Sequence, residues 1–317
     1  MSALPPTANA RVRRSLRQLC AMIGSMDPKA LRQAFKGDTV PRTVVFRAAT
    51  VLILWCVVRA LMADAWATPR ERVEFEGASQ RLISGGLIQG DRTHGYLAKP
   101  EGAGPFPAVV GLHGCAGMSD TTKRKLVDEL VGWGYVVLLV DSFTTRSIDH
   151  DCFKGILVIA RMSDALGGLA FLARQTFVDS QRVATVGFSK GAGTALTLSD
   201  DSSFTLFVRP SNLKFRAAVA FNPPCRSAGA RPLIPTLILI GSLDEWTPAA
   251  DCSEKVAAWG SDKVPIDLVV YPRVHHGFYY PELQPGRAML GRWLEYNEEA
   301  ATDASRRMRE FLKRHLN

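Results

Sequence analysis

Residues 183–196 read Val-Ala-Thr-Val-Gly-Phe-Ser-Lys-Gly-Ala-Gly-Thr-Ala-Leu, and this stretch decides the fold. A β-branched run leads into a Gly-x-Ser-x-Gly turn from Gly187 to Gly191, and small helix-compatible residues follow. We interpret it as a strand, a sharp turn with Ser189 at its apex, and a helix. The two glycines leave room where strand and helix nearly touch, which keeps the Ser189 hydroxyl clear of its neighbours. Because the helix start presents unpaired N–H groups beside that hydroxyl, Ser189 is a candidate nucleophile.

Predicted strands and helices alternate along the chain from about residue 68 onward. Segments 72–76 and 95–98 are expected to form an antiparallel edge. Further strands are predicted at 107–112, 135–140, 216–221, 233–240 and 266–271, and helices at 122–133, 156–174 and 302–314. Near-continuous apolar strands indicate a sheet that is buried on both faces. The sequence therefore predicts an α/β protein with a mostly parallel, doubly wound sheet and helices on both faces.

Candidate partners for Ser189 follow two later strands. Asp244 comes after the strand predicted at 233–240, and His275 and His276 come after the one at 266–271. Active sites of such sheets lie at the carboxyl ends of the strands, so these side chains are expected on the edge that carries Ser189. The chain order Ser, Asp, His is that of the α/β-hydrolase fold. A histidine can accept the serine proton and a carboxylate can orient that histidine, so the three residue types predict a catalytic triad.

The residues alone leave two of these assignments open. Glu245 or Asp251 could replace Asp244 as the acid, although Asp244 is the first carboxylate after its strand. Spacing separates His275 from His276 poorly, because both follow the same strand.

The N–H groups that would bind an oxyanion are predicted from two segments. The backbone N–H of Lys190, directly after the nucleophile, is expected to be the first donor. The second is expected from residues 113–117, which we call the oxyanion loop, with Cys115 as the first choice and Gly114 as the alternative. His113 at the start of this loop is interpreted as a residue that hydrogen-bonds the loop backbone and not as a general base.

The positive charge of the chain is concentrated at its N-terminus. The formal net charge is +9, and residues 1–47 alone contribute +7 of it. The remaining chain is close to neutral and has no basic stripe that would follow phosphates. We therefore expect no nucleic-acid partner.

Residues 1–67 are interpreted as a targeting leader. Basic residues precede an apolar run at 48–58, which is shorter than the roughly 20 residues of a spanning helix and suits a signal peptide. Small residues near Ala67 offer a cleavage site, so export to the periplasm or medium is expected. The alternative is an uncleaved membrane anchor at 43–62, and translation could begin at Met1 or Met26. Either way, the catalytic domain is expected at 68–317.

Four cysteines remain once the two in the leader are set aside: Cys115, Cys152, Cys225 and Cys252. The first two follow successive predicted strands, and the last two lie beyond strands of the other half of the sheet. Each pair therefore lies above one region of the same edge, and we predict the disulfides Cys115–Cys152 and Cys225–Cys252. No Cys-x-x-Cys pair is present, so no metal site is expected.

From about residue 70 onward the sequence resembles the dienelactone hydrolase family of α/β-hydrolases, in particular its exported members. The segments that carry the resemblance are 112–117, 140–143, 187–191, 244–248 and 276–278. It implies Ser189 as nucleophile, Asp244 as acid and, from the His-Gly-Phe match, His276 as base. The family's name-giving enzymes use cysteine as the nucleophile, whereas this chain has serine. Because serine does not form the thiolate of those enzymes, a dienelactone substrate does not carry over.

The sequence thus predicts a serine hydrolase that cleaves a carboxylic ester or lactone through an acyl-enzyme. No metal or organic cofactor is expected, since the oxyanion-binding N–H groups supply the electrostatic stabilisation. The expected partner is a small-molecule ester or lactone, with membrane contact only through an uncleaved leader. The alternatives are a peptidase or acyltransferase on the same scaffold, or a catalytically silent, envelope-associated binding protein.

Overall fold

A computed structural model describes residues 68, 70–152, 158–200, 205–208, 212–261 and 264–316. These residues belong to one compact unit, Thr68–Asn317. The predicted leader at 1–67, with its signal peptide or anchor, lies outside the described residues. Within the described ranges, no helix combines the length and the apolar character needed to cross a membrane.

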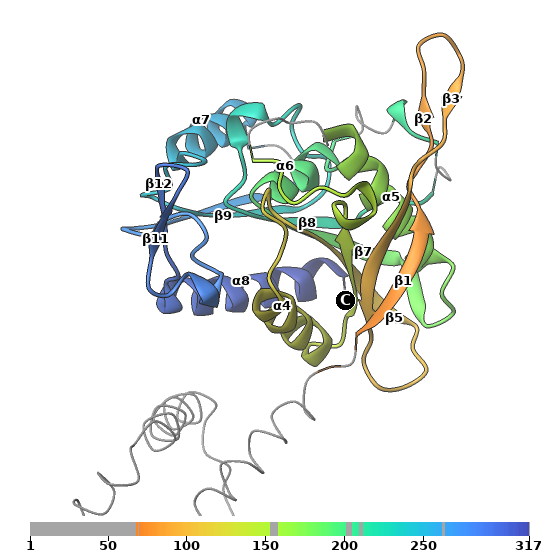
Figure 1. Cartoon of the computed structure of the whole chain (residues 1–317), viewed down its shortest axis with the longest axis horizontal. Coiled ribbons are helices and arrows are strands. Elements are labelled where there is room, and N and C mark those ends of the chain that lie inside the picture. The colour runs from red at the N-terminus through yellow and green to blue at the C-terminus, as the bar shows by residue number, and fades with distance from the viewer. Residues whose placement is uncertain are drawn as a thin grey trace, which may run out of the picture. The chain divides into compact units, whose positions relative to one another are not determined.

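One large sheet forms the centre of this unit (Figure 1). In spatial order its strands are β1 (Glu71–Glu76), β4 (Arg92–Ala98), β6 (Val136–Asp141), β5 (Phe106–Leu112), β7 (Val178–Phe188), β8 (Ala217–Phe221), β9 (Thr236–Gly241) and β10 (Ile266–Tyr271). The pairs β1–β4 and β4–β6 are antiparallel, and every other pair is parallel. The predicted mostly parallel sheet with an antiparallel edge is confirmed.

Helices cover both faces of the sheet (Figure 1). Helices α4 (Asp120–Gly132) and α8 (Glu298–Leu316) pack on one face, and α5 (Val158–Ala173), α6 (Lys190–Thr197) and α7 (Ala249–Trp259) pack on the other. Short 3-10 helices among the described residues include η1 (Thr144–Arg146), η3 (Cys225–Ser227) and η4 (Pro281–Leu283). This doubly wound arrangement is the predicted α/β-hydrolase architecture.

The sequence explains this layering through its apolar patterns. Residues 136–140 of β6 are all buried, because their side chains alternate between two helix layers. In α8 the buried residues Ala304, Met308 and Phe311 recur at spacings of three and four, so one stripe of the helix faces the sheet. Arg306, on the opposite side, forms surface ion pairs with Asp303 and Glu310.

The sequence does not predict α7, the hairpin β2–β3 (Gln80–Arg81, Leu87–Ile88), the hairpin β11–β12 (Arg287–Met289, Arg292–Leu294) or the short 3-10 helices. The hairpin strands are two or three residues long, too short for an alternating pattern to be read. Strand β9 begins at Thr236 and not at residue 233, directly after Pro235, which has no N–H to donate to a ladder. Helix α8 starts before the predicted residue 302, because the Asn297 side chain accepts the backbone N–H of Ala300.

The order of the strands creates the place for a site. From β5 the chain continues to β6 on one side of that strand and then to β7 on its other side. Ligands of doubly wound sheets bind at such a switch point, beyond the carboxyl ends of the strands. The oxyanion loop follows β5, and Ser189 follows β7.

Candidate active site

Ser189 occupies the strained turn that the sequence predicts. Its backbone φ is 50° and ψ is −117°, a conformation that L-residues rarely adopt. A Cβ on Gly187 would lie 2.3 Å from the carbonyl oxygen of Gly191, so strand and helix pack too closely for a side chain there. Ser189 precedes α6 without capping it through its side chain, and its hydroxyl makes no hydrogen bond within the described ranges. The hydroxyl is therefore available for chemistry.

Asp244 and His276 form a buried hydrogen-bonded pair. His276 Nδ1 lies 2.7 Å from Asp244 Oδ2, and the two residues are 6% and 4% exposed. The other carboxylate oxygen of Asp244 accepts the backbone N–H groups of Trp246 and Thr247 at 2.9 and 2.8 Å. Burial alone would raise the pKa of Asp244, but the hydrogen bond and charge of His276 and the N–H of Thr247 hold that pKa below its ordinary value. Asp244 is thus an anion that fixes the imidazole with Nδ1–H toward it.

Two further side chains hold Asp244 in place. Asn222 donates from Nδ2 to Asp244 Oδ2 over 2.8 Å, and the Thr247 hydroxyl lies 2.9 Å from the same oxygen. Asn222 directly follows β8 and has a positive φ of 50°. These two residues are absent from the sequence-based assignment. The position of Asn222, directly after an apolar strand that ends at the same sheet edge, is the only signal that the sequence offers for it.

The alternatives that the sequence left open make other contacts. His275 Nδ1 lies 3.1 Å from the backbone oxygen of Leu243, and its ring faces Trp293 with centroids 6.5 Å apart. The Glu245 carboxylate accepts the backbone N–H of Trp293. Asp251 pairs with Arg226 at 3.3 Å. Among these candidate bases and acids, His276 and Asp244 are the two that lie within hydrogen-bond distance of each other.

His113 organises the oxyanion loop. Its Nδ1 lies 2.7 Å from the backbone oxygen of Gly114, and its Nε2 accepts the backbone N–H of Ser142 at 3.2 Å. Burial, and then the positive charge of Arg161, lower the pKa of His113 to about 4. Arg161 also donates to the backbone oxygen of His113 at 3.0 Å. A neutral His113 therefore ties the loop to the segment after β6, as its position in the sequence suggested.

The oxyanion loop and the start of α6 lie together beside Ser189. A Cβ on Gly114 would lie 3.6 Å from both Ser189 Cβ and the backbone oxygen of Phe188. Lys190 is the first residue of α6, and its ammonium lies 3.6 Å from the buried carboxylate of Asp151. The backbone N–H of Asp151 in turn donates to the oxygen of Cys115 at 2.8 Å. The carriers of both predicted oxyanion donors are thus joined through Asp151.

Two disulfides flank the site, and they join the pairs expected from the sequence. Cys115–Cys152 ties the oxyanion loop to the segment after β6, with Cα atoms 4.7 Å apart. Cys225–Cys252 ties η3, after β8, to α7, with Cα atoms 4.9 Å apart. One covalent cross-link therefore restrains the oxyanion loop, and the other joins the segments that follow β8 and β9.

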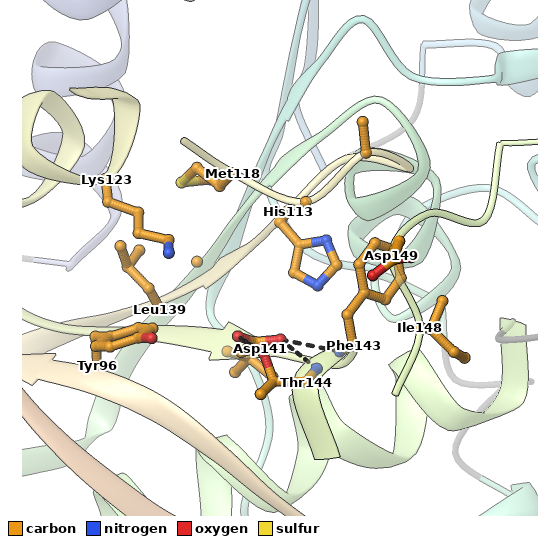
Figure 2. Close-up of a pocket in the computed structure, with 14 residues that line it drawn as sticks. Tyr96, His113, Met118, Lys123, Leu139, Asp141, Phe143, Thr144, Ile148 and Asp149 are labelled. Carbon is orange, nitrogen blue, oxygen red and sulfur yellow. Dashed lines mark hydrogen bonds between the residues drawn. The ribbon is translucent and has the colours of Figure 1, made fainter. Parts of the chain in front are cut away.

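A cavity of about 260 Å³ adjoins the oxyanion loop (Figure 2). His113 and Met118 line it on the loop side, and Lys123 and Asp141 line it from α4 and β6. The Lys123 ammonium lies 4.8 Å from the centre of the Tyr96 ring. The Asp141 carboxylate accepts the backbone N–H groups of the turn after β6. The cavity therefore combines a cation and an anion with aromatic and aliphatic walls.

Solved structures that resemble this chain include hydrolases. A protein from Klebsiella pneumoniae assigned as a dienelactone hydrolase is 21% identical, with a TM-score of 0.54, and the alignment covers 77% of this chain and 99% of that one. A dienelactone hydrolase from Anabaena variabilis is 19% identical with a TM-score of 0.53, over 78% and 99%. A propionate-bound esterase from Thermogutta terrifontis is 15% identical with a TM-score of 0.56, over 78% and 94%. The chain has the α/β-hydrolase fold.

The family follows from the sequence match. A sequence model of the dienelactone hydrolase family matches residues 93–316. A comparison with curated proteins gives no significant match. The chain belongs to the dienelactone hydrolase family, and it is a hydrolase that acts on ester bonds.

Proposed function

We propose that this enzyme hydrolyses a small carboxylic ester or lactone with Ser189 as nucleophile, His276 as base and Asp244 as the acid that orients it. The observation that carries the proposal is the buried 2.7 Å pair of His276 Nδ1 and Asp244 Oδ2. It lies at the sheet edge where Ser189 occupies its strained turn. In the tautomer that donates Nδ1–H to Asp244, the Nε2 lone pair is available for the serine proton.

The reaction runs in two halves. The Ser189 oxygen attacks the carbonyl carbon while its proton passes to His276 Nε2, and the oxyanion accepts the N–H groups of Lys190 and Cys115. The carbon–oxygen bond to the alcohol then breaks, and His276 returns the proton to the leaving oxygen. A water attacks the acyl-enzyme with His276 again as base, which releases the carboxylic acid and restores Ser189.

Asn222 and Thr247 are proposed to keep Asp244 charged and correctly turned. Together with the two backbone N–H groups and His276, they fill the acceptor positions of the carboxylate. A carboxylate with these donors stays ionised, so it stabilises the imidazolium that forms when His276 takes a proton.

None of Ser189, Asp244 and His276 lines the cavity of about 260 Å³ beside the oxyanion loop, so the size of the acyl group is to be measured by kinetics and is not inferred from that volume. Kinetics on a graded series of p-nitrophenyl esters and lactones tests this function. Wild-type protein is expected to give a burst of p-nitrophenol equal to the enzyme concentration, followed by slower turnover. The absence of both a burst and turnover on every member of the series would contradict the proposal.

We also propose that the protein is exported, which fits the leader at 1–67. The two cross-links, Cys115–Cys152 and Cys225–Cys252, support this location because disulfides persist in oxidising compartments. Mass spectrometry of the protein from the periplasm or medium is expected to find an N-terminus near Thr68. An intact N-terminus in the membrane fraction would instead indicate the anchor at 43–62.

A further inference from the structure

A small space lies between Ser189 and the hydroxyl group of Tyr280. A Cβ placed on Gly114 would lie 3.6 Å from Ser189 Cβ and also 3.6 Å from the Tyr280 hydroxyl oxygen. The missing side chain of Gly114 therefore leaves room for about one heavy atom between the candidate nucleophile and a phenol. The oxyanion of an acyl group on Ser189 is two bonds from Oγ, so this space is within its reach.

The Tyr280 ring is held firmly, whereas its hydroxyl is unused. The ring packs against Phe188 with centroids 5.6 Å apart. The backbone of Tyr280 donates to Gly277 at 2.9 Å and accepts from Leu283 at 3.0 Å. Among residues that the structure describes, none accepts the Tyr280 hydroxyl proton or donates to its oxygen. A half-buried phenol without a protein partner has its donor free for a ligand.

The neighbouring Tyr279 shows what a structural tyrosine looks like in the same loop. Its hydroxyl donates to Glu129 on α4 over 2.6 Å, and the Lys125 ammonium lies 3.8 Å from the centre of its ring. Tyr279 is 1% exposed and packs against Phe188 and Phe221. Its hydrogen-bonding capacity is used within the protein, whereas that of Tyr280 is not.

The Tyr280 hydroxyl keeps its proton across the working pH range and can therefore donate a hydrogen bond. Burial, and then the negative charge of Glu282, raise the pKa of Tyr280 well above its ordinary value. The group therefore stays a neutral O–H, which is a donor suited to a developing oxyanion.

We propose that Tyr280 is a further catalytic residue whose hydroxyl donates a hydrogen bond to the oxyanion on the substrate, across the space left by Gly114. The proposal rests on the proposed function of Ser189. It adds a third donor, from the loop after β10, to the two backbone N–H groups of Lys190 and Cys115. A side chain at Gly114 would crowd the oxyanion, because its Cβ would lie 3.6 Å from both Ser189 Cβ and the Tyr280 hydroxyl oxygen.

The test compares Tyr280→Phe with the matched control Tyr279→Phe, using esters that share one acyl group and differ in the pKa of the leaving alcohol. We expect Tyr280→Phe to lower kcat/KM at least about tenfold by the same factor on every ester, since the oxyanion is independent of the leaving group. The melting temperature should stay near that of wild type. Tyr279→Phe should lower the melting temperature and leave kcat/KM within about twofold of wild type.

A second variant keeps the proposal testable if Tyr280→Phe folds poorly. The nearest atoms to a Cβ on Gly114 are at 3.6 Å, which is ordinary van der Waals contact, so Gly114→Ala should fold normally. We expect it to lower kcat/KM more than tenfold.

Three outcomes would overturn the assignment. One is unchanged activity in Tyr280→Phe. Another is a loss that grows as the leaving alcohol becomes more basic, which would place the hydroxyl on the leaving oxygen. The third is full activity in Gly114→Ala. Inactive wild-type protein would overturn the proposed function and this inference together, whereas active wild type with inactive Ser189→Ala confines any failure to Tyr280.

Discussion

Two histidines at the same edge of the sheet have opposite surroundings. His113 and His276 are each 6% exposed. His276 has a carboxylate, Asp244, 2.7 Å from Nδ1. His113 has the carbonyl oxygen of Gly114, the N–H of Ser142 and the positive Arg161 around it. Although the two histidines are equally buried, His276 is suited to proton transfer and His113 holds a loop. The groups that contact each imidazole ring cause this difference.

Truncating each histidine in turn tests whether the two have different roles. His276→Ala is expected to lower kcat by about 10⁴-fold or more, because the serine then has no base. His113→Ala should cost about tenfold to a hundredfold, through displacement of the oxyanion loop, together with a lower melting temperature. Steady-state kinetics and thermal unfolding check both. His275→Ala should keep most of the activity. A loss in kcat as large as that of His276→Ala, in either His113→Ala or His275→Ala, would contradict the division of roles.

The acid can be tested at nearly constant shape. Asp244→Asn is expected to lower kcat about 10⁴-fold, because the amide favours the wrong imidazole tautomer. Asp251→Asn is the matched control, since Asp251 pairs with Arg226 and not with a histidine. Its kcat should stay within about twofold of wild type. An equally inactive Asp251→Asn would assign the acid to that residue instead.

The two disulfides restrain different segments, because one holds the oxyanion loop and the other joins η3 to α7. Removing either pair, as Cys115→Ala with Cys152→Ala or as Cys225→Ala with Cys252→Ala, should lower the free energy of unfolding by about 3–4 kcal/mol. Only the first pair should also lower kcat, by about tenfold, because it restrains the oxyanion loop. Denaturant unfolding and kinetics on folded protein check this, and equal effects on kcat would count against it.

The smallest effect concerns pH. In the folded protein the pKa of His113 is lowered to about 4, below its value of 6.5 in an unfolded chain. The unfolded state therefore binds the proton first, so stability is complete above pH 6.5 and falls toward pH 4, by as much as about 3 kcal/mol. His113→Gln should remove this part of the pH dependence. Urea unfolding between pH 4 and 7.5 measures the free energy of unfolding of wild type and of His113→Gln. If that free energy depends on pH in the same way in both proteins, the assignment is contradicted.

Strong apolar runs made most of the sheet predictable. Strand β10 has the predicted bounds, because its apolar run ends at Tyr271, just before Pro272. Asn222 and Thr247 could not be assigned, since their contacts with Asp244 depend on β8 lying beside β9 and on the local turn after β9. Tyr280 could not be assigned either, because its place beside Gly114 joins loops about 165 residues apart in sequence, and only the folded chain brings them together.

In the proposed mechanism the pair of Asp244 and His276 activates Ser189. Labelling with a fluorophosphonate probe, followed by peptide mass spectrometry, tests this activation, because the probe reacts with activated serines. We expect one adduct per chain, on Ser189, formed by wild type, by His275→Ala and, more slowly, by His113→Ala, and lost in His276→Ala. An adduct on another serine, or undiminished labelling of Ser189 in His276→Ala, would contradict it.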